Sequence, residues 1–241
     1  MEFNEIVAPS IKQLFVQTIE NAILSGKMKI GEKLPTEREL AKQMKISRSI
    51  VNLGLNELKQ KGFIEINPRQ GAVVGDYIKN GNTDILLSII NYNNDKVDKL
   101  TFNSLAHFRL INEGEAAYLA ALNRTEQNLE DIKKIAKELY NTTDIHDFSS
   151  KLFDFHHEIF FATGNIIYPL VHNAFRDICV KITDSLYTNY PFSKSLDIID
   201  KLIDAIENKD TSQSRKHMAN LIQDGFDWLA PKYHKQTFSQ I

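Results

Sequence analysis

The segment of residues 34–58, LPTERELAKQMKISRSIVNLGLNEL, constrains the fold of this chain more than any other. Its apolar residues recur at helical spacing on both sides of a short polar stretch, which predicts two short helices joined by a tight turn. Thr36 and Glu39 have the form of a capping box at the start of the first helix, and Ser47 is a good N-cap for the second. The pattern therefore predicts a compact helix pair with an exposed tip at residues 47–49.

A further helix and a hairpin flank this pair. Apolar residues at helical spacing from Ile11 to Ile23 predict a helix before it. After it, short β runs at 63–66 and 72–74 are joined by the polar stretch NPRQG, which predicts a hairpin with a basic tip. A helix, a helix-turn-helix and a hairpin in this order form a winged helix-turn-helix, which we assign to residues 1–75.

The second helix of the pair carries residue types that suit a DNA major groove. Small side chains at Ser47 and Ser49 allow close approach to base edges, and Arg48 can bond guanine O6 and N7 or a phosphate. The hairpin would add backbone contacts beside the groove. Taken alone, Arg48 or Arg69 is more simply an ordinary solvated charge, so the prediction depends on the whole arrangement.

The net charge of −2 averages two unlike parts of the chain. Residues 1–75 hold 11 Lys and Arg against 8 Asp and Glu, whereas the remaining 166 residues hold 18 against 23. A basic unit on an acidic body suits a module that contacts phosphates while the rest avoids them. An architectural DNA-binding protein that senses nothing would be basic throughout, which argues against that class.

Residues 76–241 show helical spacing without strand alternation, which predicts an all-helical domain and a mostly α protein. This body has no glycine-rich phosphate loop, zincin motif or nucleophile elbow, which argues against an enzyme. No run approaches the roughly 18 apolar residues of a membrane span, and the start lacks a signal-peptide pattern. We therefore expect a cytoplasmic protein that contacts no membrane, with Cys179 as a buried apolar residue. The helices are expected near residues 82–93, 96–122, 125–141, 145–163, 166–189, 193–208 and 211–229.

Residues 8–75 closely resemble the DNA-binding domain of the GntR family of bacterial transcription regulators. The matching text is AILSGKMKIGEKLPTERELAKQMKISRSIVNLGLNELKQKGFIE, followed by QGAVV. Two positions depart from the family pattern, because many members have Arg in place of Asn52 and Gly in place of Lys45. A left-handed Lys45 would cost roughly 1 kcal/mol. By position, the resemblance implies DNA contacts from Arg38, Ser47, Arg48, Ser49, Ile50, Asn52 and Gly71.

The helical body resembles the FCD subgroup of this family at residues 109–117 and 155–165. Many FCD members bind a divalent metal through one Asp and three His. Three of the four corresponding positions here are aliphatic and cannot coordinate a metal, and one imidazole does not hold a metal at useful affinity. We therefore expect no metal. The corresponding positions are Leu152, His156, Ile199 and Leu221; nearby polar residues that offer an alternative set are Asp154, His157, His172 and His217.

The FadR-like branch, which regulates fatty acid metabolism, is the better match because it has the helical domain without the metal. The resembling segments are 161–168, 187–192 and 225–228. Such proteins bind long-chain acyl-CoA, and aliphatic residues at the former ligand positions are what an apolar ligand cavity requires. The simpler alternative is that these aliphatic residues only fill a core. The resemblance implies an effector site that includes Arg109, Tyr187, Gly225, Trp228 and Lys232.

We therefore expect a ligand-responsive transcription regulator. A homodimer would bind a palindromic operator on double-stranded DNA and change its affinity when a long-chain fatty acyl-CoA binds. Within the same class, the alternative effector is a small carboxylate metabolite, with or without a bound metal. An enzyme tethered to a DNA-binding head would need several hundred more residues, so we expect no catalytic residues and no resident cofactor.

Overall fold

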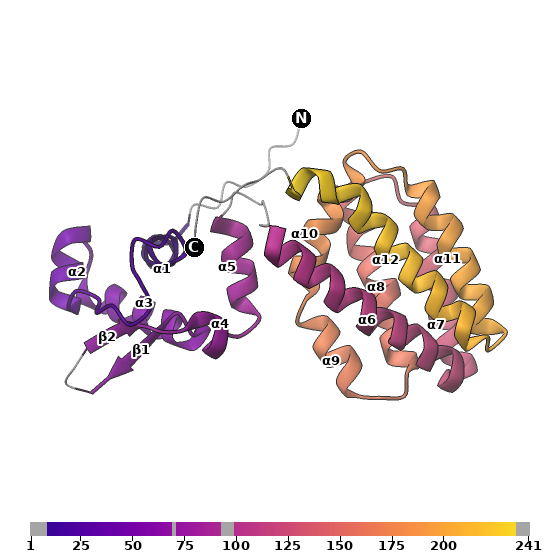
Figure 1. Ribbon diagram of the computed structural model, residues 1–241, viewed down its shortest axis with the longest axis horizontal. Coiled ribbons are helices and arrows are strands. Elements are labelled where there is room, and N and C mark those ends of the chain that lie inside the picture. The colour runs from indigo at the N-terminus through magenta and orange to yellow at the C-terminus, as the bar shows by residue number, and fades with distance from the viewer. Residues whose placement is uncertain (1–8, 69–70, 93–98, 235–241) are drawn as a thin grey trace. The chain divides into compact units, whose positions relative to one another are not determined.

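The computed structural model describes residues 9–68, 71–92 and 99–234, and most of these residues are helical (Figure 1). The chain divides into two compact units between its fifth and sixth helices. The predicted fold class is confirmed, since a winged helix-turn-helix precedes an all-helical unit. No helix among the described residues is both long and apolar enough to cross a membrane.

The first unit contains five helices and one antiparallel hairpin among the described residues. In the hairpin Ile64 pairs with Val74 and Asn67 with Gly71, and Lys33 adds a bridge to Val73. The elements are α1 (Ile11–Leu24), α2 (Glu37–Met44), α3 (Arg48–Lys61), β1 (Ile64–Asn67), β2 (Gly71–Val74), α4 (Tyr77–Asn80) and α5 (Asp84–Tyr92).

Local capping fixes the ends of α2 and α3. The Glu39 backbone N–H donates to Thr36 Oγ1 (3.3 Å), and the Thr36 backbone N–H donates to Glu39 Oε2 (2.8 Å), so the predicted capping box is confirmed. Lys45 ends α2 in the left-handed conformation, with φ 54° and ψ 42°. Ser47 then caps α3 by accepting from the Ile50 backbone N–H (3.3 Å).

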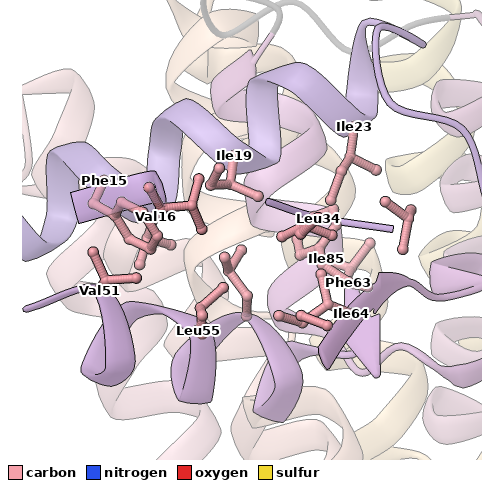
Figure 2. Packing of buried hydrophobic residues seen from close by; sticks show 14 residues of the cluster. Phe15, Val16, Ile19, Ile23, Leu34, Val51, Leu55, Phe63, Ile64 and Ile85 are labelled. Carbon is pink, nitrogen blue, oxygen red and sulfur yellow. The ribbon is translucent and has the colours of Figure 1, made fainter. Parts of the chain in front are cut away.

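The core of the first unit lies between α1 and α3. Figure 2 shows Phe15 and Ile19 of α1 facing Val51 and Leu55 of α3. The two helices approach closely at Gly54, where an added Cβ would lie 2.3 Å from Phe15 Cδ1. Any larger residue at that position would push the helices apart.

The first unit extends beyond the boundary at residue 75 that we placed from the sequence. Helix α5 packs against α1, and Ile85 is a buried member of the core in Figure 2, only 4% exposed. The structural division therefore falls after α5. This later boundary was not predicted, since the helical spacing of residues 82–93 continues that of the body.

The second unit is a helical bundle in which the long helices α6 and α12 lie side by side (Figure 1). Small buried residues on α6, including Ala117 and Ala121, allow this close approach. Its elements are α6 (Lys99–Asn123), α7 (Glu126–Tyr140), α8 (Ile145–Ala162), α9 (Ile167–Asn173), α10 (Arg176–Tyr187), α11 (Phe192–Glu207) and α12 (Thr211–His234).

Two of the predicted helices differ from the structure. The single helix expected over 166–189 is divided into α9 and α10 by a turn in which the Phe175 backbone N–H donates to His172 O (3.0 Å). Helical spacing on both sides of the turn hides this change of direction. Helix α12 also continues past residue 229 to His234 with Pro231 inside it.

Candidate nucleic-acid interface and buried cavities

The N-terminal turn of α3 presents the candidate DNA-contacting side chains to solvent. Ser47, Arg48, Ser49 and Asn52 are exposed, while Ile50 is half-buried. The opposite face of α3 is anchored in the core by buried apolar residues. A rigid helix therefore holds an exposed polar tip, as insertion into a major groove requires.

Glu37, which the sequence analysis missed, connects α2 to this tip. Asn52 Nδ2 donates to Glu37 Oε1 (3.1 Å), and Arg48 Nη2 lies 3.9 Å from Glu37 Oε2. Sequence separations of 15 and 11 residues hid this arrangement, which arises only when α2 packs on α3. The carboxylate thus binds Asn52 and lies near the charge of Arg48.

The other two candidate contacts flank this tip in the sequence. Arg38 is exposed in the first turn of α2. Gly71 begins β2 with φ +90°, a conformation that favours glycine, at the hairpin that forms the wing. Arg69 at the predicted wing tip lies outside the described residues.

A small cavity in the second unit brings together three of the five candidate effector residues. Arg109, Tyr187 and Gly225 line it, whereas Trp228 and Lys232 do not. Its volume is about 40 Å³. Tyr187 donates a hydrogen bond to Ser195 Oγ (2.6 Å), and a Cβ at Gly225 would lie 3.1 Å from Leu186 Cδ2. The full lining is Arg109, Leu152, His156, Ile182, Thr183, Leu186, Tyr187, Leu221, Ile222, Gly225, Phe226 and Leu229.

Trp228 of α12 lies beside Tyr190 and Lys194, and we call these three residues the Trp228 cluster. The indole is 47% exposed and meets Tyr190 edge-on with ring centroids 5.4 Å apart. Lys194 Nζ lies 5.8 Å from the Trp228 ring centroid, and Lys232 donates to Ser185 Oγ. Trp228 thus packs against one neighbour while much of its ring stays open to solvent.

The family's metal-ligand positions in this chain do not fit a metal. Leu152, His156 and Leu221 line the same small cavity, and Ile199 is fully buried. The register predicted from the sequence therefore brings three of these positions to one cavity. Leu152 and Leu221 contribute apolar side chains to a lining that also contains Arg109, and His156 is its single imidazole.

A different set of buried polar groups lies beside this cavity. Glu113 accepts hydrogen bonds from Arg109 Nε and from His156 Nδ1, the latter at 2.6 Å. Burial alone would raise the pKa of the Glu113 carboxyl, but the charges of Arg109 and His156 hold that pKa well below its usual range. The sequence motif Arg109-xxx-Glu113 marked the first pair, one helical turn apart.

Glu113, His156 and His172 offer ligand atoms within 4.8 Å of one another. Because Arg109 already neutralises the Glu113 carboxylate, this set presents no net negative charge to a divalent cation. It is therefore a poor metal site.

A second, larger cavity lies between α6, α8, α9 and α10, with a volume of about 200 Å³. Several of its residues lie in the family-like segments 109–117 and 155–168, but the sequence did not indicate that these segments enclose a cavity together with α10. The lining is Phe108, Arg109, Asn112, Glu113, Phe160, Asn165, Ile167, Tyr168, Val171, His172, Phe175 and Cys179.

The chain matches two family models, described as "Bacterial regulatory proteins, gntR family" over residues 12–74 and "FCD domain" over residues 104–224. The HTH-type transcriptional regulator Mce2R of Mycobacterium tuberculosis is 26% identical over 224 residues, which cover 92% of this chain and 93% of that protein. The fatty acid metabolism regulator protein of Proteus mirabilis is 25% identical over 196 residues, which cover 80% of each chain.

Solved structures share the fold at lower identity. The protein Lar of Listeria monocytogenes superposes with a TM-score of 0.65 at 14% identity, covering 94% of this chain and 99% of its own. A Streptococcus agalactiae GntR protein gives a TM-score of 0.50 at 20% identity, covering 90% and 99%.

Proposed function

Since this chain belongs to the GntR family of bacterial transcription regulators, with an FCD domain, we propose that it acts as a homodimer whose affinity for a palindromic operator is controlled by long-chain acyl-CoA. Membership makes it a DNA-binding regulator and not an enzyme. It would act in the cytoplasm, where bacterial DNA lies.

The proposed DNA contacts fall into two groups, those to base edges and those to the phosphate backbone. Arg48, Ser49 and Asn52 would meet base edges in the major groove, because they form the exposed first turn of α3. Arg38 and the wing at Gly71 would contact the phosphate backbone, with Ser47 and Ile50 supporting the tip. Two copies related by a two-fold axis would read two half-sites of a palindrome.

The observation that carries the acyl-CoA proposal is the apolar small cavity beside the Trp228 cluster. Leu152 and Leu221 make the former metal position hydrophobic, which suits an acyl chain. Trp228 offers an exposed ring for stacking an adenine, and Lys194 and Lys232 offer positive charge for phosphates. The Proteus mirabilis relative, named for fatty acid metabolism, supports the same effector class.

The small cavity must enlarge to accept a long acyl chain, and this requirement supplies a mechanism. A volume of about 40 Å³ holds only a water-sized group. To enter, the acyl chain would have to separate α10 from α12 at the point where Leu186 contacts Gly225. An effector that binds only the widened bundle shifts the population toward that state, and thereby changes DNA affinity if the two states hold the operator differently.

A small carboxylate metabolite is the second candidate effector, and to bind Arg109 it would have to displace Glu113. The guanidinium lines both cavities and is the ordinary partner of a carboxylate. This alternative is compatible with a bound divalent metal or with none, whereas the acyl-CoA proposal predicts less than one equivalent of zinc or nickel in the purified protein. A full equivalent that His156→Ala removes would favour the carboxylate sensor.

Competition between effector and operator tests the proposal. Duplexes selected from a random pool by the protein are titrated in the presence of palmitoyl-CoA, free CoA, palmitate or citrate. Micromolar palmitoyl-CoA should release the DNA, while free CoA and palmitate should not. Trp228→Ala should weaken the response about tenfold, and Tyr140→Ala, at another half-exposed aromatic, should not. Release by citrate alone would contradict the acyl-CoA assignment.

A further inference from the structure

We propose that the larger cavity between α6, α8, α9 and α10 binds an uncharged aromatic molecule that carries a hydroxyl group, with His172 Nε2 as the hydroxyl's partner. This second site is distinct from the proposed acyl-CoA site, with which it shares only Arg109 in its lining. It does not depend on the acyl-CoA assignment.

The size and lining of this cavity favour a ring. A cavity of about 150 Å³ lined by apolar side chains is large enough for benzene, and this one measures about 200 Å³. Four of its residues, Phe108, Phe160, Tyr168 and Phe175, present aromatic side chains. Such side chains pack well against the face or edge of an aromatic ligand.

The cavity also changes from buried to exposed along its depth. His172, Phe160 and Cys179 are at most 6% exposed, whereas Ile167 is 56% and Val171 43% exposed. A ligand seated on the buried side would thus lie beneath an apolar rim. Glu113, the one acidic residue of the lining, is 2% exposed and therefore does not belong to that rim.

The charges in the lining favour a neutral ligand. Arg109 is bound to Glu113, so the only two formally charged lining residues cancel. Burial lowers the pKa of His172 to about 3 and raises the pKa of the Cys179 thiol to about 11, so both groups are neutral near pH 7. An anion would lose its hydration here without gaining an unpaired positive charge.

His172 supplies the one fully buried side-chain nitrogen or oxygen in this lining that has no hydrogen-bond partner among the described residues. Its ring is stacked on Phe153 and Phe160, with centroids 4.2 Å away in each case. Its Nδ1 lies 3.2 Å from His157 Nδ1, while its Nε2 is buried and has no hydrogen-bond partner among the described residues. A buried polar atom without a partner costs free energy that a ligand's hydrogen bond would recover.

A hydroxyl fits this atom better than a carbonyl or an amine does. Because two Nδ1 atoms face each other, one of the two rings donates and the other accepts, which leaves His172 Nε2 either an acceptor or a donor. A hydroxyl both donates and accepts. It therefore satisfies Nε2 in either arrangement.

Three probes with the same ring system test the proposal by isothermal titration of the full chain without DNA. They are naphthol, naphthalene and naphthoate, which differ in whether they carry a hydroxyl, no polar group or a charge. Naphthol should bind most tightly, naphthalene about tenfold more weakly, and naphthoate weakest of all. Tightest binding by naphthoate, or no binding by any of the three, would overturn the proposal.

Two variants locate the site. His172→Phe keeps a stacked ring but removes Nε2, so naphthol should lose about tenfold in affinity while naphthalene changes by less than about twofold. Cys179→Phe places a ring in the cavity and should weaken both ligands at least tenfold. If Cys179→Phe keeps its helical circular dichroism and binds naphthol and naphthalene with unchanged affinity, the ligands bind elsewhere and the proposed site is refuted.

Discussion

His156 Nδ1 and Glu113 Oε2 lie 2.6 Å apart, with both side chains about 3% exposed. Glu113 also binds Arg109 one helical turn away on α6, so this carboxylate ties α6 to α8 inside the second unit. Removing a buried carboxylate that pairs with a buried guanidinium leaves that positive charge uncompensated.

Replacing Glu113 should therefore destabilise the second unit strongly. Glu113→Gln keeps the side chain's size but leaves the buried Arg109 guanidinium without its counter-charge, and we expect a loss of about 3 kcal/mol in the free energy of unfolding. Urea denaturation followed by circular dichroism measures this loss. Glu126→Gln is the matched control, because Glu126 also pairs with a buried arginine, Arg124, but is itself 82% exposed. Equal losses in the two variants would show that burial of Glu113 does not matter.

His172 should make the stability of the protein fall in mild acid. Burial lowers its pKa from 6.5 to about 3 in the folded state, so the unfolded chain takes up this proton more readily. Stability is therefore lost as pH drops below 6.5 and continues to fall toward 3. Replacing the imidazole by His172→Phe should reduce the loss between pH 7 and pH 5 by about 2 kcal/mol. The midpoints of urea denaturation at pH 7 and pH 5 measure this loss of stability. An equal loss in the wild-type protein and in His172→Phe would contradict the burial of a neutral His172.

Arg48 should be needed for specific DNA binding but not for folding. Its side chain is 71% exposed at the tip of α3. Arg48→Ala should lower the affinity for a selected operator duplex by roughly 100-fold, since it removes a charged contact near base edges. Lys59→Ala, which removes an exposed charge at the other end of the same helix, should have little effect. Fluorescence anisotropy compares them, and unchanged binding by Arg48→Ala would exclude α3 as the reading helix.

Glu37 should weaken DNA binding in the wild-type protein. Its carboxylate binds Asn52, lies near Arg48, and would repel phosphates. Glu37→Gln keeps an acceptor for Asn52 but removes the charge, so affinity for duplex DNA should rise several-fold, most visibly at low salt. Glu57→Gln, at the end of α3 away from the tip, serves as a control for the general loss of a negative charge. A fall in affinity would mean that Glu37 acts mainly by positioning the tip.

Lys45 should carry a small backbone strain in the turn between α2 and α3. With φ 54° and ψ 42° it occupies a conformation that glycine adopts without penalty. Lys45→Gly should therefore stabilise the first unit by up to about 1 kcal/mol. Gln43→Gly, in the interior of α2, should instead destabilise it by a similar amount. Thermal unfolding shows whether each variant raises or lowers the melting temperature. Destabilisation by both variants would show that Lys45 makes a compensating contact.

Features that depend on a few neighbouring residues were determined by the sequence alone. The capping box at Thr36, the cap at Ser47 and the presence of the hairpin follow from hydrogen bonds spanning three or four residues, or a short loop, whereas the pairing register of the two strands was not predicted. The exposed tip of α3 follows from helical spacing, because the buried residues of that helix define its opposite face. The resemblance to the FCD subgroup, and not helical spacing, grouped Leu152, His156 and Leu221, which line one cavity.

Only the tertiary structure decided which distant groups meet. Ile85 joins the first unit's core, Glu37 reaches Asn52, and His172 stacks between Phe153 and Phe160. These contacts depend on how whole helices pack and where the chain turns between α9 and α10. Helical spacing records which face of a helix is buried, but it does not record which other helix covers that face.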